Sequence, residues 1–593
     1  MQRKFLEYLI PSILVNIAVY VTTVVDSIIV GNMLGEAALS AVGLSSPVIY
    51  SINAMYLLFA IGGATCASIA KGRRETDNAN RIFTITFAAG FTAMFALLAV
   101  FLIFMKLITS ALAQGNQALA EMTRAYLTPL VCSGPIIMLI MGMGQFVRTD
   151  GKPKIAAYIA IVMNVTNIIL TYSFIRFFDM GLWGVGLSTV LGYTAGIFAV
   201  IPYLRSKERT LRFIKPKNVD FAQIPHIAAI GSPKALRQGW LFLRTLILNG
   251  LIVSTLGSTG MAAMAVCSNA FMLISMFISG TNDTLLPIAG TLYGEKDYPG
   301  IRFVVRTGFK FLIAACVLVM VFLLAFPGEI GRLFGIHSAE GIAIVKPALR
   351  MYALSLPLYS INVMLYSFYQ TTKRIKLASL IVSLNSFVFV TLFAFMFAGI
   401  NANLIWLAFV LSDAATLIVL FGAGIHIRRK ENVAGILLLH KDLQSISLDL
   451  SIPAAVEAAT GLSEQVIQFC RKQGMRTFGS LPMERIRSTD DSGAMRMGIA
   501  VEEMAVNTAL YGHKKNKGVI DVLVRVTDDE LILRLRDDGA PFDPVKYQPE
   551  EESEFAMGGI EMVRRLADDI SYTRQLGFNV TIITIKRSVL KEK

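Results

Sequence analysis

The chain has 593 residues, of which 54% are hydrophobic and 16% are charged, whereas a soluble domain carries about 25% charged residues. This composition excludes an ordinary soluble protein and indicates a polytopic membrane protein for most of the length. The net charge of +14 does not indicate a nucleic-acid partner, because the part from His440 onward holds 21 Lys+Arg against 24 Asp+Glu. The basic excess therefore belongs to the apolar part, where it sets orientation in the lipid bilayer.

Twelve apolar segments, each long enough to cross a bilayer, are predicted before residue 430. They lie at 9–31, 44–70, 83–106, 126–147, 155–178, 182–204, 227–256, 261–288, 303–327, 347–371, 376–399 and 402–427. Loops rich in Lys and Arg alternate with loops that have none, such as 32–43 and 256–261. The positive-inside rule then predicts a multi-pass protein of the cytoplasmic (plasma) membrane with both termini in the cytoplasm.

The first segment carries one carboxylate, Asp26, well inside its apolar run. An Asp at a helix centre costs about 2.5–3.5 kcal/mol to insert, so such a residue usually faces a water-filled cavity and has a function. Other polar residues recur along one face of this helix at spacings of three and four: Asn16, Tyr20, Thr23 and Ser27. We interpret this face as the lining of a functional cavity; a polar seam that joins two helices is the alternative.

An internal repeat at a constant offset of 222 residues connects the two halves of the apolar part. The matched pairs are Pro11 and Pro233, Leu34-Gly35 and Leu256-Gly257, Gly72 and Gly294, Thr149 and Thr371, Lys154 and Lys376, and Ala156 and Ala378. Six segments per repeat is an even number, so the halves, about 5–205 and 226–427, enter the membrane in the same direction. This is a transporter architecture with a cleft between two bundles.

Several motifs occur in this order: VDSIIVG, LG-x-x-AL-x-A, RTDGKPKIA, GLWGVGLST, GSPKAL, LPIAG and LYGEKDY. Together they resemble the MATE (multidrug and toxic compound extrusion) transporters over about residues 5 to 427. The resemblance implies an antiporter for multidrug efflux (xenobiotic transport) in the cell inner membrane. Its substrates would be small cationic or amphipathic organic compounds, exported in exchange for H+ or Na+.

The same resemblance implies a site for the coupling ion. Its residues would be Asp26 on the first helix, Asn167 and Thr171 on the fifth, and Thr189 on the sixth. Thr171 stands where the family leads one to expect a second carboxylate. Because one carboxylate binds a hard cation less strongly than two, this departure favours protons over sodium. The repeat carries Asp26 onto Leu248, so the ion site is expected in the first half only.

Further charged residues lie inside the apolar segments of the second half. Asp283 is in the eighth segment, and Arg237 and Arg244 are seven apart on one face of the seventh. They are candidates for substrate contact in the cleft; an Asp–Arg structural pair is the alternative. Asp413, in the twelfth segment, is interpreted as making polar contacts with a neighbouring helix.

After Lys430 the composition becomes charged, with a linker at 431–447 and a domain at 448–593. Strands are predicted at 519–527 and 530–536, joined at Asp528-Asp529, and at 579–587. Helices are predicted at 454–473, 495–512 and 558–568. This part of the chain is long enough for one α+β domain.

Within this domain, Glu503 and Asn507 are four apart and project from one face of helix 495–512. Asp537-x-Gly539 follows, and then glycines open a helix, where phosphates can approach the helix N-terminus. In this order, with LDLSIPAAVEA and RLRDDGAPFDP, these pieces resemble the GHKL ATPase superfamily, most closely the serine-kinase anti-sigma factors. The expected fold is therefore an all-α membrane bundle of twelve helices in two repeats, followed by an α+β, Bergerat-like sandwich.

The GHKL resemblance implies a site for ATP and Mg2+. Asn507 would help to hold magnesium, Glu503 would act as the catalytic general base, and Asp537 would read the adenine amino group. Glycines would shape the pocket and its lid: Gly539, Gly558 and Gly559. The plain G-G-I replaces a fuller glycine-rich lid motif, which makes tight closure over ATP less expected.

Two functions remain open from the sequence. One is a cation-coupled exporter with a cytoplasmic ATP-binding regulatory or kinase domain. The other is a membrane-anchored anti-sigma-like serine protein kinase whose transporter half is a sensor, with a STAS-like or sigma-factor-like protein partner. Transport powered directly by ATP ranks last, because no G-x-x-x-x-G-K-[ST] motif occurs.

Overall fold

A computed structural model describes residues 2–113, 116–207, 209–215, 221–333, 336, 339–431, 433–440, 446–477, 483–512, 518–527, 530–547 and 558–586. The chain forms two compact units, Met1–Leu439 and His440–Lys593. The predicted turn at Asp528-Asp529 and most of the acid-rich loop before Gly558 lie outside the described residues.

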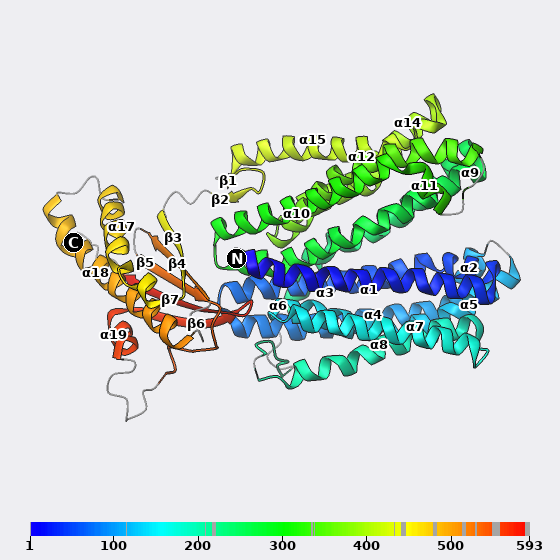
Figure 1. Cartoon of the computed structure of the whole chain (residues 1–593). Coiled ribbons are helices and arrows are strands. Elements are labelled where there is room, and N and C mark those ends of the chain that lie inside the picture. Colours follow the sequence, from blue (N-terminus) through cyan, green and yellow to red (C-terminus); the bar gives the residue numbers. More distant parts are fainter. Residues whose placement is uncertain are drawn as a thin grey trace. The chain divides into compact units, whose positions relative to one another are not determined.

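The first unit is built of long apolar helices (Figure 1). Those of its first half are α1 (Gln2–Leu34), α2 (Glu36–Leu44), α3 (Ser46–Gly72), α4 (Thr76–Leu112), α5 (Gln117–Cys132), α6 (Gly134–Thr149), α7 (Pro153–Arg176) and α8 (Gly181–Arg205). Those of its second half are η2 (Phe221–Gln223), α9 (Ile224–Gly294), α10 (Tyr298–Ala325), α11 (Pro327–Leu333), α12 (Ala339–Thr371), α13 (Ile375–Ser383), the π-helical turn Leu384–Val388, α14 (Phe389–Ile400), η4 (Ala402–Leu404) and α15 (Leu407–Lys430). Eleven spans of the described chain are long and apolar enough to cross a membrane, and α5 with α6, bent by 52°, makes a twelfth. The predicted twelve-helix bundle is confirmed.

The internal repeat is visible in the backbone itself. Gly35 (φ 85°, ψ 179°) and Gly257 (φ 63°, ψ −156°), 222 residues apart, both take a conformation that is essentially restricted to glycine. Two further pairs at this offset also have positive φ: Arg74 (65°) with Lys296 (58°), and Gly151 (87°) with Lys373 (62°). The two halves therefore repeat their turns as well as their helices. Gly257 breaks α9 into two spans, the seventh and the eighth.

The two halves meet along α3 and α9, which pack closely against one another. A Cβ on Gly72 would lie 2.0 Å from the Thr291 carbonyl oxygen, and one on Gly294 would lie 2.2 Å from that of Ile69. These two glycines are themselves a matched pair of the repeat, and their Cα atoms approach each other at this crossing. Only residues without a side chain allow this contact.

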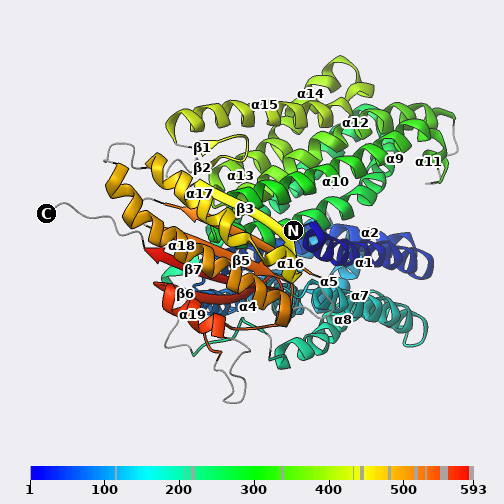
Figure 2. The ribbon, with the colours of Figure 1, turned by 60° about the vertical axis from the view of Figure 1, so that its left-hand side comes forward.

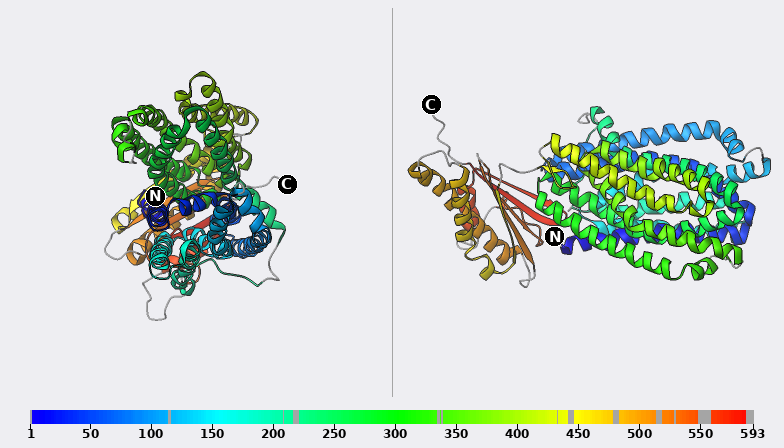
Figure 3. Two further views of the ribbon diagram at one scale, coloured as in Figure 1. Left: turned by 90° about the vertical axis from the view of Figure 1, so that its right-hand side faces the viewer. Right: turned by 90° about the horizontal axis from the view of Figure 1, so that it is seen from above.

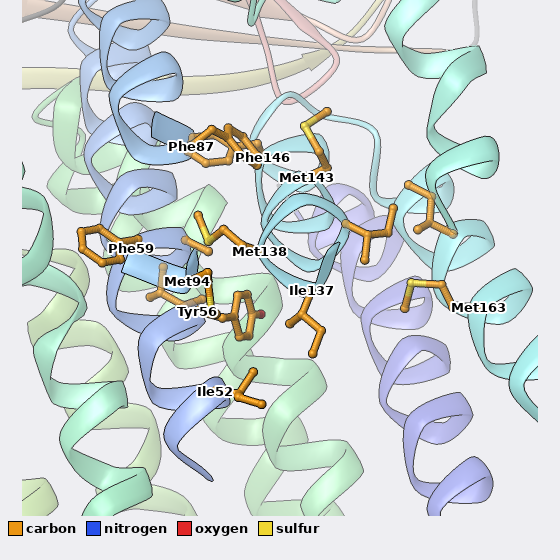
Figure 4. Close-up of a cluster of buried hydrophobic side chains, with 14 of the residues drawn as sticks. Ile52, Tyr56, Phe59, Phe87, Met94, Ile137, Met138, Met143, Phe146 and Met163 are labelled. Carbon is orange, nitrogen blue, oxygen red and sulfur yellow. The ribbon is translucent and has the colours of Figure 1, made fainter. Parts of the chain in front are cut away.

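Inside the first half, α3, α4, α6 and α7 share a core of aromatic and methionine side chains (Figure 4). Phe87 of α4 and Phe146 of α6 lie with ring centroids 5.7 Å apart. Met94, Met138 and Met143 fill the space around them. Unbranched methionines adapt to irregular gaps between helices. This core fixes α7, which carries Asn167 and Thr171.

The second unit is an antiparallel sheet with helices on one face (Figures 2 and 3). The order of the five strands is β3-β4-β5-β7-β6. Their bounds are β3 (Ile446–Pro453), β4 (Val519–Val526), β5 (Glu530–Asp537), β6 (Asp569–Gln575) and β7 (Phe578–Lys586). A two-stranded ribbon at the end of the first unit, β1 (Val433–Ala434) with β2 (Leu439–His440), precedes them. The predicted α+β class is confirmed, although β3 and β6 were not predicted as strands.

The helices of the second unit differ from the expected ranges at their ends. They are α16 (Val456–Ala459), α17 (Leu462–Thr477), α18 (Met483–Asn507), a π-helical turn (Thr508–Gly512) and α19 (Gly558–Leu566). The predicted helix 454–473 is two helices, because Gly461 with φ 89° separates them. Met497, Val501 and Met504 of α18 are buried against the sheet, as their spacing predicts.

Candidate ion, substrate and nucleotide sites

The first site surrounds Asp26 of α1. With the Asn167 amide oriented toward the carboxylate, its nitrogen donates to Asp26 Oδ2 at 2.9 Å, and its oxygen accepts from the Thr189 backbone N–H and hydroxyl at 3.2 Å each. Thr171 lies beside the carboxylate, and its hydroxyl is 2.7 Å from that of Ser188. The structure therefore brings together all four residues expected there, with Ser188 in addition.

This cluster lies on a cavity of about 400 Å³ within the first half. Asp26, Asn167 and Thr189 line it, together with the rings of Tyr126 and Tyr193. Thr22, Thr23 and Ser27 of α1 face the same space. The polar face of α1 thus lines a cavity, as the functional interpretation of the sequence requires.

A second cavity of about 590 Å³ is lined by both halves of the bundle. Asn16 and Tyr20 of α1 contribute from the first half, so the polar face of α1 serves two cavities. Asp283, Arg237 and Arg244, the residues expected in the cleft, all line it. The volume lies in the 300–1,000 Å³ range of sites for drug-sized ligands.

The partners of Asp283 differ from the Asp–Arg pair considered from the sequence. Its carboxylate lies 3.4 Å from Arg148 Nη1 and 3.7 Å from Lys234 Nζ, and the Asn16 amide donates to it at 3.4 Å. Arg148 comes from the first half, so this ion pair joins the halves across the cavity. The sequence could not indicate it, because 135 residues separate the partners along the chain.

Asp413 of α15 makes the polar contacts expected of it. It accepts hydrogen bonds from the Asn362 amide at 3.1 Å and from the Asn385 amide. Asn385 lies in the π-helical turn, an irregularity that is frequent at functional sites. The second half therefore holds a buried carboxylate of its own. The repeat predicted an ion site in the first half only, and that prediction does not include Asp413. The sequence signal for these partners is that Asn362 and Asn385 each lie inside an apolar segment.

The third site lies in the second unit, where α18, β5 and β7 meet. Asp537 Oδ1 accepts from the Gly539 N–H and from Asn579 Nδ2, at 2.9 Å each. Tyr572 and Arg574 donate to the Asn579 oxygen at 2.8 and 2.7 Å. Burial raises the pKa of Tyr572, which keeps its hydroxyl protonated as a donor. Sequence reasoning missed Asn579, which orients the expected Asp537.

Glu503 and Asn507 of α18 lie against the start of α19. A Cβ on Gly559 would be 2.1 Å from Glu503 Oε2 and 3.2 Å from Asn507 Nδ2, so Gly559 allows the helix start to approach both side chains. Within the described residues, the Asn507 nitrogen is buried without a hydrogen-bond partner. A small cavity of about 30 Å³ is lined by Asn507, Asp537 and Asn579.

Several residues that the sequence implies for a nucleotide site lie close together. Asn507, whose amide nitrogen is unpartnered among the described residues, lines the small cavity with the buried Asp537 and also lies against Gly559 at the start of α19. Buried polar atoms without partners are rare in folded proteins, and a ligand would satisfy the Asn507 amide. Gly539 packs against the Gly512 carbonyl oxygen: a Cβ on Gly539 would lie 2.4 Å from that oxygen.

Comparison with known families decides the assignment of the membrane unit. The MatE family model matches residues 11–173 and 238–396, which is more than half of the chain. The chain belongs to the MatE family. A model described as "Histidine kinase-like ATPase domain" matches residues 455–585 of this MatE protein. The resemblances found in the sequence are confirmed for both units.

Relatives and solved structures of this MatE chain are distant. Multidrug export protein MepA of Staphylococcus aureus (strain MRSA252) is 22% identical over 287 residues, and that of Staphylococcus haemolyticus is 24% identical over 289 residues. Each alignment covers 48% of this chain and 63% of MepA, so the chain spans less than two thirds of these relatives. The Vibrio cholerae MATE transporter VcmN matches with TM-score 0.67 at 18% identity, covering 73% of this chain and 98% of VcmN. An outward-facing multidrug resistance MATE transporter matches with TM-score 0.64 at 20% identity, covering 72% and 96%. At these identities the structures establish the fold.

Proposed function

We propose that the membrane unit is an antiporter that exports small amphipathic organic compounds in exchange for a cation. The observation that supports it best is the Asp26 cluster on a cavity inside a MatE bundle. An ionisable group at this depth is a functional site by default. MepA, to which the chain is similar, is named a multidrug export protein. We place the protein in the cytoplasmic membrane with both termini in the cytoplasm.

In this mechanism Asp26 holds the coupling proton at its carboxylate. The Asn167 amide, which donates to Oδ2, stabilises the ionised form, and Thr189 holds Asn167 in place. Loading the proton weakens that hydrogen bond and gives the cluster two states with different contacts. A ligand shifts such an equilibrium only through its different affinity for the two states. Protons are supported over sodium, because Thr171 supplies a hydroxyl where a second carboxylate would favour a metal cation.

The second unit is proposed to bind ATP with Mg2+ and to regulate export or signal from it. Asp537 would read the adenine amino group, Asn507 would hold magnesium, and Glu503 would be the general base. Bound Mg2+ would neutralise phosphate charge. Serine kinase activity toward a STAS-like or sigma-factor-like partner is the second candidate. The proximity of Glu503 to the helix start at Gly559, where a phosphate would approach, supports it.

The test of export is gradient-driven efflux from vesicles that contain the full chain and no ATP. Asp26→Asn should abolish efflux, because the amide cannot carry the proton. Asp179→Asn is the matched control: it makes the same chemical change on an exposed residue between α7 and α8. Efflux that survives Asp26→Asn would overturn the assignment of this residue.

A further inference from the structure

The charge of the 590 Å³ cavity indicates the kind of substrate it accepts. Four basic side chains line it and two acidic ones. The basic residues are Arg148, Lys234, Arg237 and Arg244; the acidic residues are Asp283 and Asp413. The lining therefore carries a formal excess of two positive charges. In a low-dielectric wall such an excess attracts anions and repels cations.

The acidic residues of the cavity are already engaged with the protein. Asp283 is shared between Arg148 and Lys234, and two asparagine amides donate to Asp413. A cationic ligand would have to compete with these partners for either carboxylate. The cavity thus lacks a ready acceptor for a cation among its described residues.

Arg237 and Arg244 are in the opposite situation. Among the described residues neither is within 4.0 Å of a carboxylate, although Asp413 lines the same cavity. Arg237 donates to the Tyr359 hydroxyl and stacks over the Tyr359 and Tyr366 rings at 5.9 Å. Arg244 lies 6.0 Å from the Phe409 ring centre. A guanidinium has five N–H donors, so donors remain for a ligand.

The two arginines lie at different depths of a membrane span. The span runs from Phe221 to Gly257, and at 1.5 Å per residue Arg244 is about 20 Å from its Gly257 end and Arg237 about 30 Å. In a hydrocarbon core about 30 Å thick, Arg244 is inside the apolar region and Arg237 is at its far edge. A charged side chain at the depth of Arg244 is expensive and marks a substrate or ion pathway. Seven residues make about two helical turns, so both side chains project from the same face of α9.

The rest of the lining suits an aromatic body. Tyr352 packs edge-on against Phe409 with centroids 4.7 Å apart, and Phe271 against Tyr359 at 5.1 Å. These rings surround the two guanidinium groups on the same wall. A ligand with a flat apolar part and an acidic group would meet both features.

We propose that this cleft binds amphipathic organic anions, with Arg237 and Arg244 as receptors for a carboxylate or similar acidic group. Charge-assisted hydrogen bonds from arginine to a carboxylate are frequently bidentate and are stronger than neutral ones. Binding of the anion does not depend on the proposed export function; only the export of the bound anion rests on it. The proposal replaces the cationic substrates that the sequence resemblance implies.

The test compares two dyes with the same ring system, anionic fluorescein and cationic rhodamine 6G. Binding to the purified full chain is measured by fluorescence anisotropy. Fluorescein should bind more tightly than rhodamine 6G. Arg237→Gln and Arg244→Gln should each weaken fluorescein binding by about tenfold or more, the effect of losing a charged hydrogen bond. Arg306→Gln, an exposed arginine of α10, should leave it unchanged.

Arg237→Lys and Arg244→Lys keep the charge and guard against loss of folding; each should bind fluorescein more weakly than the wild type, because lysine lacks the planar fork, but more tightly than the corresponding Gln variant. Tighter binding of rhodamine 6G, or fluorescein binding that the Gln variants do not change, would overturn the anion site. The same vesicles separate this result from the export function. Arginine-dependent fluorescein binding without gradient-driven movement of either dye contradicts export and supports the anion site. Gradient-driven efflux of rhodamine 6G without that binding supports export and refutes the anion site.

Discussion

At the scale of residues, a buried ion pair fixes the end of the first half. Lys71 Nζ lies 2.7 Å from Asp150 Oδ1, and the two side chains are 6% and 0% exposed. Tyr203 and the Thr210 backbone N–H donate to Asp150 Oδ2 at 2.8 and 3.0 Å. Burial raises the pKa of Asp150, but the Lys71 charge and these hydrogen bonds outweigh it and hold the pKa below its ordinary value. The carboxylate thus joins α3, α6, α8 and the segment after α8.

Asp150→Asn should lower the free energy of unfolding by about 3–5 kcal/mol, because it leaves the Lys71 charge buried without its counter-ion. The folded-state pKa is lowered, so the ionised carboxylate stabilises the protein above its ordinary pKa. That stability is lost as the pH falls below about 4. Thermal unfolding in detergent should therefore separate the variant from the wild type at pH 7, with the gap narrowing below pH 4. Asp179→Asn should unfold like the wild type, and equal unfolding temperatures for Asp150→Asn at pH 7 would contradict the pairing.

A second prediction concerns Gly559, in the candidate nucleotide site. Gly559→Ala would place a methyl group 2.1 Å from Glu503 Oε2 and 3.2 Å from Asn507 Nδ2, which displaces these two side chains or the start of α19. Binding of a fluorescent ATP analogue should weaken by about tenfold or more, whereas overpacking costs about 1–3 kcal/mol in stability. Gly493→Ala on α18 meets only Leu531 at 3.4 Å and should bind normally. Unchanged binding by Gly559→Ala would separate this helix start from the nucleotide.

At the scale of elements, the break in α9 rests on the backbone of Gly257. Its surroundings are open, with no atom within 4 Å of a Cβ, so only conformation opposes a side chain there. Gly257→Ala should destabilise the protein by about 1–3 kcal/mol, the cost of holding Ala in this region of φ and ψ. Gly250→Ala, equally open but helical, should be neutral or stabilising. Thermal unfolding of both variants in detergent tests this, and equal behaviour would contradict it.

The elements also show what sequence reasoning could reach. Apolar length predicted the spans, and identities at one offset predicted a repeat whose turns share positive φ, because both signals are local to the chain. The start of α18 at Met483 and the strands β3 and β6 were missed. Charged residues such as Asp449 and Asp569 weaken the apolar alternation of these two strands. Pairing with β4 and β7 nevertheless places β3 and β6 in the sheet.

The residues of the candidate sites also divide into those with a local sequence signal and those without one. Asp26, Asn167 and Asp537 could be named in advance, because each stands in a motif. The partners of Asp283 and of Asp413 could not, since they come from helices distant in sequence and depend on how the bundle packs. The net positive charge of the cleft also depends on how the bundle packs. The family resemblance implies cationic substrates and so did not predict this charge.

At the scale of the whole molecule, the two proposed functions belong to separate compact units of one chain. The membrane unit holds an acid and a cleft, which the proposed exchange of a cation against a substrate would use. The second unit matches a histidine kinase-like ATPase domain, and the sequence has no loop of the kind that powers P-loop transporters. ATP is therefore expected to change the rate of exchange and not to supply its energy. Linkage between the sites requires that nucleotide binding differ between states of the membrane unit.

This gives a prediction for vesicles with ATP and Mg2+ on the side of the second unit. Gradient-driven efflux should proceed without ATP and change several-fold when ATP is added, in the range of ordinary allosteric coupling. Glu503→Ala and Asn507→Ala should each abolish that change and keep the basal efflux, whereas Asp26→Asn should abolish efflux under both conditions. Glu464→Ala, an exposed residue of α17, is the control. Efflux that requires ATP would contradict the antiporter. Efflux that ignores ATP, together with Glu503-dependent phosphoryl transfer to a protein partner, would favour the kinase, because the second unit would then act on another molecule and not on its own membrane bundle.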